Sequence, residues 1–501
     1  MNILLVYPKY PDTYWSFKHA LRFISKKAAV PPLGLLTVSA MLPKNWSKKL
    51  VDMNVSTLQE KDILWADYVF ISAMYIQKES VDQVIQLCIK NHTKIVAGGP
   101  LFTQEFGNYP QIDHFVLNEA EITLPLFLND LNSEQGAKPI YETDEYADMT
   151  LSPVPDYQLL NLKAYASMNL QITRGCPFAC DFCEITALLG HQVRMKSPRQ
   201  ILDELDKLYN LNWRRPIMVA DDNFIGKKAE VKNKLLPAMK NWMDAHGHPF
   251  EFTAQTSINL ADDKELLSLM TEAGFVSTFI GIESPDEASL QECNKVQNKN
   301  RDLLQSVMNI QKAGMQVSGG FIVGFDNDTP SVFKRQIDFI ARSGIVAAMV
   351  GLLNAPKNTK LYQRLEKEQR LTTDATGSNT DYSMNFVPKM DKAELMKGYR
   401  EIIYGLYSVK PYYKRVRQLL INYIPHTKKT KKIELSKLVA FFKSIFIIGI
   451  AIRGQGEYWK FMIWTLFKKP ALFVDAVTFT VYGYHYRKTY GISGKHSLQS
   501  Q

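Results

Sequence analysis

The stretch Arg174-Gly-Cys176-Pro-Phe-Ala-Cys180-Asp-Phe-Cys183 decides how the rest of the chain is interpreted. It places three of the five cysteines within eight residues, directly after a predicted apolar strand at 170–173. Thiolates in a CxxxCxxC spacing on one loop can reach three corners of a [4Fe–4S] cluster. The fourth iron would then have no protein ligand and would be open to a substrate or a cofactor.

Structural zinc, a redox dithiol and chance are the alternatives to a cluster at these cysteines. A structural zinc site needs four closed ligands, but Cys88 and Cys293 are remote in the sequence and neither has a CxxC partner. A redox dithiol needs one CxxC pair, and chance clustering of three among five cysteines in 501 residues is improbable. We therefore predict that Cys176, Cys180 and Cys183 hold an iron–sulfur cluster in a reducing compartment.

The length and composition describe a folded protein with several domains. A chain of 501 residues with 46% hydrophobic and 22% charged residues is too long for one compact core and is not disordered. The first residues have no basic segment and no cleavage site of a signal peptide. The longest apolar run, 438–452, is interrupted by Lys443 and is too short for a membrane span. We expect a cytoplasmic protein.

Residues 1–135 predict a first domain of alternating strands and helices. Short apolar strands are expected at 3–7, 49–54, 68–73, 94–97 and 115–117. The alternation with helices implies a parallel, doubly wound, Rossmann-like sheet. Ligands of such sheets bind beyond the carboxyl ends of the strands. Residues 136–165, rich in acids and prolines, are expected to be a linker.

Alternation resumes in residues 166–370 and predicts a second α/β domain. Strands are expected at 170–173, 217–220, 251–255, 277–281, 316–323 and 347–352. About six βα units with right-handed crossovers fit a full or partial (β/α) barrel. Residues 371–501 lack the alternation and predict a helical, basic and aromatic C-terminal domain, with turns at Pro388, Pro411 and Pro425.

The cysteine motif resembles that of the radical S-adenosylmethionine (SAM) superfamily, in which an aromatic residue precedes the last cysteine, as Phe182 does here. The resemblance implies that the open iron chelates SAM, whose reductive cleavage yields a hydrogen-abstracting 5′-deoxyadenosyl radical. Phe182 of the motif and polar residues at the predicted strand ends are the expected SAM contacts; the polar residues are Asp221, Asp222, Asn223, Gln255, Ser257 and Glu283. A purely structural role is the alternative for each of them, because Asp at such a junction often caps the next helix.

The first domain resembles the cobalamin-binding domain that precedes many radical SAM barrels. The expected cobalamin contacts lie at strand ends: Tyr7, Pro8, Ser72, Gly98, Gly99, Pro100 and Glu119. Asn118 stands where the family usually has glycine, and Asn tolerates a left-handed backbone. The D-x-H-x-x-G motif is absent, so no histidine of this domain is expected below the cobalt. A degenerate flavodoxin-like domain that binds nothing is the alternative.

Across nearly its whole length, the chain resembles cobalamin-dependent radical SAM proteins with a C-terminal domain of the DUF4070 type. The resemblance is carried by Tyr14–Ala20, Phe23–Lys27, Pro31–Leu36, Asp221–Gly226, Asn294-Lys295 with Gln297-Asn298, and Gly398-Tyr399-Arg400. The subgroup includes hopanoid C-2 methylases and enzymes that form rings in archaeal tetraether lipids. Bacteriochlorophyll side-chain methylases pair similar domains.

The basic character of the chain is confined to its C-terminal quarter. Net charge is +10, and from Lys397 onward 19 Lys and Arg face four acids. Aromatic residues interleave with these lysines, which is typical of segments in a membrane interface. We expect peripheral membrane contact through 397–495, at the inner face of the membrane. A solvated basic face and an RNA-binding surface are the alternatives, and no nucleic acid is expected because a second cysteine triad is absent.

The combined prediction is a radical SAM methyltransferase that uses a [4Fe–4S] cluster, SAM and cobalamin. Its expected substrate is small, hydrophobic and hopanoid- or isoprenoid-like, and is methylated at an unactivated carbon. Flavodoxin or ferredoxin is the expected reductant. Alternatives are a lipid cyclase or oxidoreductase without methyl transfer, a tetrapyrrole side-chain methylase, and a non-catalytic regulator that binds the cofactors.

Overall fold

The computed structural model describes the chain except for residues 379–380, 426–434 and 493–501. It separates into two compact units. The first comprises Met1–Pro11, Val30–Pro177 and Ile185–Asp222, and the second comprises Asp12–Ala29, Phe178–Glu184 and Asn223–Gln501. Over the described residues, no helix has the length and apolarity that a membrane crossing requires.

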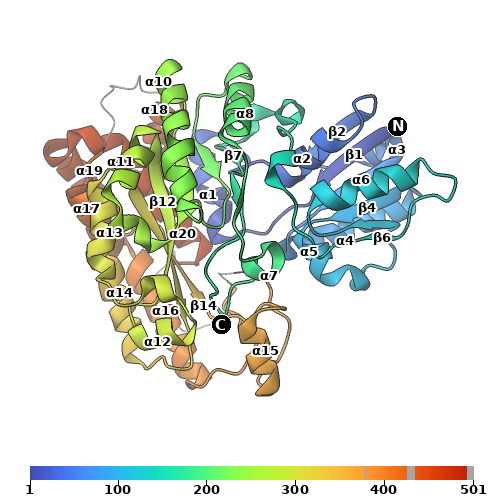
Figure 1. Cartoon of the computed structure of the whole chain (residues 1–501). Helices are drawn as coiled ribbons and strands as arrows, with labels where there is room; N and C mark the ends of the chain where they lie inside the picture. The colour runs from blue at the N-terminus through green and yellow to red at the C-terminus, as the bar shows by residue number, and fades with distance from the viewer. Residues whose placement is uncertain (379–380, 426–434, 493–501) are drawn as a thin grey trace. The chain divides into compact units, whose positions relative to one another are not determined.

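A six-stranded parallel sheet forms the centre of the first unit, in the order β2-β1-β3-β4-β5-β6 (Figure 1). Its strands are β1 Asn2–Tyr7, β2 Ser47–Asp52, β3 Tyr68–Ser72, β4 Lys94–Gly98, β5 His114–Val116 and β6 Ile140–Tyr141. Its main helices are α2 Leu33–Met41, α3 Glu60–Trp65, α4 Lys78–Lys90, α5 Pro100–Glu105 and α6 Ala120–Leu131. From β1 the chain adds β2 on one side and then β3 to β6 on the other. In doubly wound sheets, ligands bind at the carboxyl ends of the strands where the order changes direction in this way.

Both faces of this sheet are buried, as its continuous apolar strands predict. Leu4 and Val6 of β1 pack into one core with residues of α3, α4 and α5. Ile3 and Leu5 pack into the opposite core with residues of α2 and α6. The predicted strands are therefore confirmed, while β6 lies inside the predicted linker 136–165 and pairs with β5.

The remaining part of the first unit holds the flanks of the cysteine loop. Strands β7 Met168–Leu170 and β10 Ile217–Val219 pair in parallel. Strands β8 Thr173–Arg174 and β9 Arg194–Met195 pair antiparallel, so the two ends of the loop are fixed together. Helices α7 Ile185–Leu189 and α8 Pro198–Asn210 complete this part. Residues 166–222 thus begin the predicted βα alternation.

Four parallel strands continue the alternation in the second unit, each paired with the next in chain order. They are β11 Phe252–Thr256, β12 Phe275–Glu283, β13 Gln316–Val323 and β14 Ala348–Leu352. The helices are α9 Lys228–Glu230, α10 Leu236–Ala245, α11 Lys264–Glu272, α12 Glu287–Glu292, α13 Leu303–Lys312, α14 Ser331–Ser343 and α15 Lys360–Lys367. Pairing of neighbours in sequence is typical of a (β/α) barrel wall.

The C-terminal part is helical, as predicted. It contains α16 Lys392–Tyr407, α17 Val409–Asn422, α18 Leu435–Phe446, α19 Gln455–Lys468 and α20 Phe473–Thr489 (Figure 1). The turn predicted at Pro411 is wrong, because the break lies at Ser408 and Pro411 falls in the first turn of α17. Proline is tolerated there, since the first helical N–H groups have no partner within the helix.

The segment 12–29 packs among these last helices. Tyr14 stacks on Tyr486 of α20 with ring centroids 4.4 Å apart, and its hydroxyl lies 3.1 Å from that of Tyr407. The buried His485 ring contacts the Tyr14 carbonyl oxygen at 3.0 Å. Burial lowers the pKa of His485 to about 4, so its ring is neutral at physiological pH. These contacts hold the segment 12–29 against α16 and α20.

Candidate functional site

The cysteine loop begins at a backbone position that only glycine fits. Gly175 has φ +89, and a Cβ there would lie 2.9 Å from the carbonyl oxygen of Gln192. The next residue, Cys176, donates its backbone N–H to the Gly190 carbonyl at 3.3 Å. The Cys183 N–H bonds the Cys180 carbonyl at 3.1 Å, so both segments of the loop follow defined turns.

All three predicted ligands are partly exposed, whereas Cys88 and Cys293 are buried. Cys176 is part of the first unit, and Cys180 and Cys183 are part of the second. Among the described residues, no three Cys, His, Asp or Glu side chains already form a metal-binding group. The assignment of the three thiolates as cluster ligands therefore remains a prediction of their spacing.

A buried lysine approaches the two cysteines of the second unit. The Lys295 ammonium donates to Glu283 Oε1 at 2.7 Å and lies 5.9 Å from the centre of the Phe182 ring. Burial lowers the pKa of Lys295, but Glu283 and the thiolates of Cys180 and Cys183 outweigh it and raise the pKa above its usual value. Lys295 therefore stays charged and places a cation beside the predicted cluster.

The segment after α12 also contacts the cysteine loop directly. Gln297 Nε2 lies 3.7 Å from Cys180 Sγ, and Asn294 Nδ2 donates to the Ala179 carbonyl at 3.0 Å. The Asp181 N–H donates to the Cys293 carbonyl at 3.1 Å. Hydrogen bonds and positive charge near the sulfurs are the means by which a protein sets the potential of an iron–sulfur cluster.

Glu283 occupies a strained position at the end of β12. Its φ is +63, in the left-handed region, and the pairing of β12 with β13 shifts register between Gly281 and Glu283. A Cβ on Gly281 would come within 2.8 Å of Lys295 Nζ. Strain and bulges of this kind re-aim side chains at functional sites, here toward the cysteine loop.

The two aspartates after β10 have different surroundings. Asp221 is completely buried, and its carboxylate accepts bonds from the Ile172 N–H at 2.7 Å and the Thr173 N–H at 2.9 Å. Asp222 is bonded by the Gly175 N–H, but its buried Oδ2 has no hydrogen-bond partner among the described residues. Burial raises the pKa of Asp222 to about 6, so the carboxylate is charged at neutral pH.

The lone oxygen of Asp222 is the observation that fits the SAM assignment. A buried, charged and unpartnered carboxylate oxygen is costly unless a ligand satisfies it. The other contact of this carboxylate is the N–H of Gly175, the residue before Cys176, and an amino group is the kind of donor that would satisfy its free oxygen. Asp221, in contrast, already uses both carboxylate oxygens to hold the strand before the loop.

The predicted SAM residues Asn223, Gln255 and Ser257 belong to the second unit. Asn223 and Ser257 are joined, because Asn223 Oδ1 accepts from the Ser257 N–H at 3.2 Å and Nδ2 contacts Ser257 Oγ at 3.3 Å. The Gln255 side chain is exposed, while its carbonyl accepts from the Phe224 N–H at 2.9 Å. The structure thus brings Asn223 and Ser257 into contact. Glu283 and Phe182 both lie near the Lys295 ammonium, which therefore links them.

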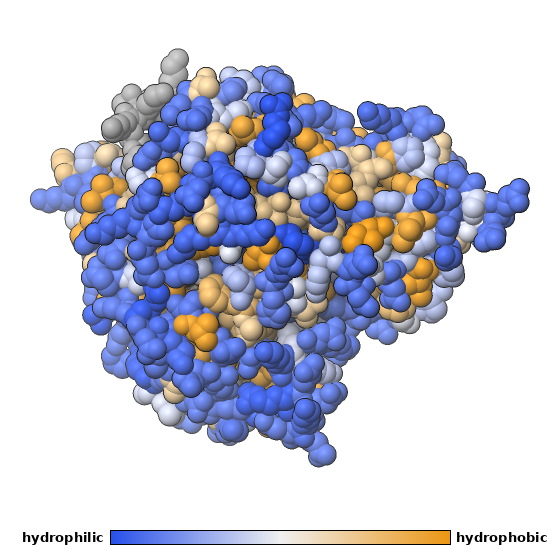
Figure 2. Space-filling view, in the orientation of Figure 1, coloured by the Kyte–Doolittle hydropathy of each residue, from blue (hydrophilic) through white to orange (hydrophobic). Residues whose placement is uncertain are grey.

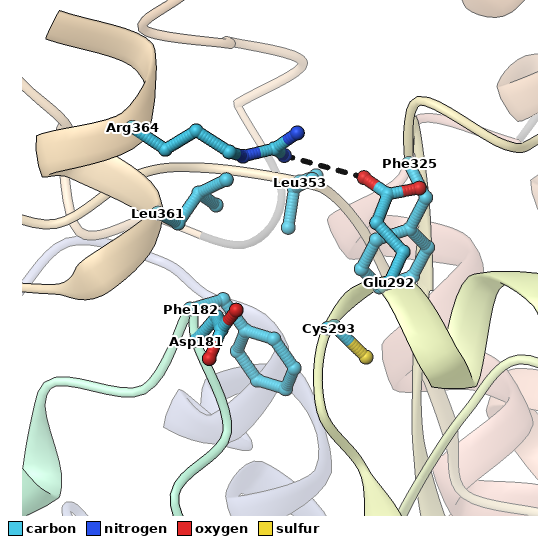
Figure 3. Close-up of a pocket in the computed structure, with 8 residues that line it drawn as sticks. All are labelled: Asp181, Phe182, Glu292, Cys293, Phe325, Leu353, Leu361 and Arg364. Atoms are coloured by element: carbon cyan, nitrogen blue, oxygen red, sulfur yellow. Dashed lines mark hydrogen bonds and ion pairs between the residues drawn. The ribbon is translucent and has the colours of Figure 1, made fainter. Parts of the chain in front are cut away.

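A small pocket lies beside Phe182 (Figure 3). Its lining residues are Asp181, Phe182, Glu292, Cys293, Phe325, Leu353, Leu361 and Arg364. It has room for about one water molecule, so it is not a substrate cavity. Arg364 bonds Glu292 at 3.3 Å and Asp326 at 2.8 Å, which fixes α15 beside the Gly324–Asp328 turn.

The predicted cobalamin residues lie along the carboxyl edge of the first sheet. Gly99 has φ +90, and a Cβ there would lie 2.7 Å from Ser72 Oγ; a Cβ on Gly98 would lie 2.6 Å from the Val116 carbonyl. Pro100 is the first residue of α5, and the Pro8 carbonyl accepts from Gln77. Glycines at these positions keep the strand ends close together and free of side chains, which fits the approach of a large planar ring.

Tyr7 and Glu119 have partners within the protein. Tyr7 ends β1, and its hydroxyl is hydrogen-bonded to the Gln77 side chain. Glu119 Oε2 binds Arg174 at 2.9 Å and Arg194 at 2.7 Å. Asn118 has φ +60, which confirms the left-handed backbone expected there.

The residues that the sequence reasoning missed are mainly charged. Arg174 also binds Glu121 at 2.8 Å, so the residue before Gly175 is tied to the edge of the first sheet. Lys295 and Gln297 belong to a motif that the sequence singled out without giving it a role. Their place directly after a strand end and a short helix is the signal that could have found them.

Comparison with known proteins identifies three consecutive regions. Residues 23–128 match the B12 binding domain, residues 170–340 match the radical SAM superfamily, and residues 359–496 match a domain of unknown function, DUF4070. These matches confirm the predicted cofactors, which are a [4Fe–4S] cluster, SAM and cobalamin. The domain boundaries at 135, 165 and 370 stay predictions.

Relatives and solved structures extend over nearly the whole chain. An uncharacterized methyltransferase of Synechocystis sp. is 39% identical over 97% of this chain and 91% of its own length. The hopanoid C-2 methylase of Rhodopseudomonas palustris is 31% identical over 92% of this chain and 89% of its own.

Two solved structures share the fold. The cobalamin-dependent SAM radical enzyme OxsB aligns with TM-score 0.64 and 16% identity over 99% of this chain and 84% of its own. The SAM radical methyltransferase TsrM of Kitasatospora setae aligns with TM-score 0.59 and 13% identity over 98% of this chain and 99% of its own. These structures share the fold, whereas the two relatives and the three matched regions show that this chain belongs to the cobalamin-dependent radical SAM methyltransferases with a DUF4070 domain, the family that includes hopanoid C-2 methylase.

Proposed function

We propose that this enzyme methylates an unactivated sp³ carbon of a small hydrophobic substrate of the hopanoid or isoprenoid type. The observation that supports it most is the similarity to hopanoid C-2 methylase over 92% of the chain, which includes the C-terminal domain. When bound, the cluster with SAM supplies a hydrogen-abstracting radical, and cobalamin supplies the methyl group.

The chain's own residues have distinct parts in this proposal. Cys176, Cys180 and Cys183 hold the cluster, and Asp222 accepts a hydrogen bond from the amino group of SAM. The joined pair Asn223 and Ser257 presents an amide and a hydroxyl side by side in the second unit. Glu283 and Phe182 contact SAM beside the charged Lys295, while Asp221 and Gln255 act through the backbone that they hold.

The first sheet would bind cobalamin along its carboxyl edge. Tyr7, Pro8 and Ser72 end two adjacent strands, β1 and β3. Gly98, Gly99, Pro100 and Glu119 end or follow the next strands. Asp113 and His114 have roles in the sheet, since Asp113 accepts from the Ile95 N–H at 2.8 Å and His114 Nδ1 contacts the Lys138 carbonyl at 2.8 Å. No lower histidine ligand is therefore proposed from this pair.

Product analysis tests the proposed reaction. The protein, reconstituted without oxygen with iron, sulfide and cobalamin, is incubated with SAM, dithionite and a pentacyclic triterpenoid. We expect both 5′-deoxyadenosine and S-adenosylhomocysteine, and a triterpenoid with one added methyl group. Deoxyadenosine without S-adenosylhomocysteine would instead favour ring formation or oxidation. Neither product would favour a binding module. A tetrapyrrole tested in parallel checks the side-chain methylase alternative.

The partners follow from the same proposal. A one-electron donor such as flavodoxin or ferredoxin would reduce the cluster. Peripheral contact of 397–495, of which residues 426–434 and 493–495 lie outside the described residues, with the inner face of the membrane would bring the enzyme to a lipid substrate. Nucleic acid has no part in it.

Lys295 should set the reduction potential of the cluster. Replacing it by methionine removes a buried cation near Cys180 and Cys183 and leaves Glu283 unpaired, so adding an electron to the cluster costs more. We expect Lys295→Met to shift the potential downward by ~50–100 mV, measured by potentiometric titration of the reduced-cluster EPR signal. Lys299→Met in the same segment is the matched control, because Lys299 bonds the exposed Gln291 instead. Equal potentials in both variants would contradict this role.

A further inference from the structure

The helices α18 and α19 present two apolar stripes to solvent. On α18 and the following π-helical turn η11 (Ile447–Ala451), the stripe recurs every four residues: Leu438, Phe442, Phe446 and Ile450. On α19 it comprises Trp459, Ile463, Leu466 and Phe467. Phe446 is 65% exposed and Phe467 is 76% exposed. At the left of Figure 2, where Figure 1 draws α19, apolar side chains reach the surface among polar ones.

These stripes belong to a well-packed helical hairpin. On the inner side, the Ser444 hydroxyl lies 3.0 Å from that of Tyr458. Trp459 belongs to the exposed stripe, and its indole N–H also donates to the Gly449 carbonyl at 3.0 Å. A Cβ on Gly449 would lie 2.9 Å from the Tyr458 ring, so η11 and the start of α19 meet closely. The hairpin is therefore packed at its turn, and each of its helices carries an apolar stripe that is exposed to solvent; the two stripes together are called its outer face.

The segment that carries the two stripes is strongly basic. Residues 437–469 contain six basic residues and one acid. Lys437, Arg453, Lys460 and Lys468 are exposed. The acid, Glu457, is bonded by Lys460 at 3.1 Å. The combination of exposed Phe, Trp and Leu with a rim of lysines is what an amphipathic helix needs to lie in the headgroup region of an anionic bilayer.

We infer that the outer face of the α18–α19 hairpin docks onto an anionic lipid bilayer. The inference rests on the membrane contact proposed above and names the surface that makes it. A second copy of the chain would bring two surfaces of the same charge together, which opposes pairing. A bilayer with negative headgroups receives both the aromatic side chains and the lysines.

Vesicle binding by the full chain tests this surface. The protein is sedimented with phosphatidylcholine vesicles that contain or lack phosphatidylglycerol. We expect binding that requires phosphatidylglycerol and weakens with added salt. The triple variant Phe442→Ser, Phe446→Ser, Phe467→Ser should bind at least about tenfold more weakly. The charge variant Lys460→Glu, Lys468→Glu should lose the preference for phosphatidylglycerol.

The matched control removes equally exposed apolar side chains from the first unit. Leu64, Leu126 and Leu151 are 66%, 49% and 72% exposed, and changing all three to serine should leave vesicle binding intact. Unchanged circular dichroism of each variant excludes loss of folding. Absence of vesicle binding by the wild type, or equal binding by the hairpin variant and the control, would overturn the inference. So would a dimer, seen by light scattering, that only the hairpin variant abolishes.

The result is separable from the proposed reaction. Methylation of detergent-dispersed substrate should persist in the hairpin variants, because the substitutions lie outside the cofactor residues. Lost vesicle binding with retained methylation supports docking, whereas vesicle binding by a protein that methylates nothing would reject the reaction and leave the docking surface in place.

Discussion

Alanine at Cys176, Cys180 or Cys183 should leave the protein with almost no bound iron and no SAM cleavage. Each thiolate would hold one iron of the cube, and with two ligands left the cluster cannot be retained. The wild type, purified without oxygen and reconstituted, should contain about four irons per chain. Iron and sulfide analysis, the EPR spectrum of the reduced protein, and 5′-deoxyadenosine formation measure the effect.

Cys293 provides the matched control for this experiment. It lies beside the loop, since its carbonyl accepts from the Asp181 N–H at 3.1 Å. Burial raises the pKa of its thiol, so it stays protonated and is a poor ligand. Cys293→Ala should therefore keep the iron and its EPR signal. If it lost iron as Cys180→Ala does, the cluster would have four cysteine ligands and no open iron for SAM.

Asp222→Asn should weaken SAM binding by ~100-fold. The wild-type Oδ2 is buried without a hydrogen-bond partner among the described residues, and it is charged at neutral pH. Asparagine keeps the shape but loses the charge that attracts the amino group of SAM. Calorimetric titration of the cluster-loaded protein with SAM gives the affinity, and the SAM-induced change in the cluster EPR spectrum gives an independent readout. Wild-type affinity in the variant would contradict the assignment.

The pH dependence supplies a second check on Asp222. Its pKa of about 6 is raised by burial, so the carboxylate is protonated as the pH falls through 6. The amino group of free SAM is protonated over that range, so any proton that it releases on binding iron affects the wild type and the variant alike. We expect the affinity to fall as the pH drops from 7 to 5 in the wild type. The decline in the Asp222→Asn protein should be smaller.

Much of the fold could be predicted because buried parallel strands are continuous apolar runs. Tyr68–Ser72 and Lys94–Gly98 are short, bounded by polar residues, and recur with helices between them. The strand Ile140–Tyr141 was not predicted, because a strand of two residues is too short to show the alternation of apolar and polar side chains. Its pairing with Phe115 and Val116 depends on a contact across the chain, which composition does not reveal.

The candidate site could be proposed where local spacing carries the chemistry. The three cysteines stand in one short motif, and Asp222 was proposed from its place after a predicted strand and from the resemblance to the radical SAM superfamily. Lys295 was not, because only the folded chain brings the segment 293–297 back to the loop at 179–183. Likewise, the ion pair of Arg174 with Glu119 joins residues that lie 55 positions apart.

The packing of Tyr14 against Tyr486 also constrains biosynthesis. Within the second unit, residues 12–29 are synthesised before the segments 178–184 and 223–501. Their partners in α20, however, belong to the helix that is synthesised last among the described ones. The early segment must remain unpaired, or held by a chaperone, for almost the whole of translation. A fragment that stopped near residue 370 would leave the Tyr14 side chain, which is fully buried in the complete chain, without Tyr407, His485 and Tyr486.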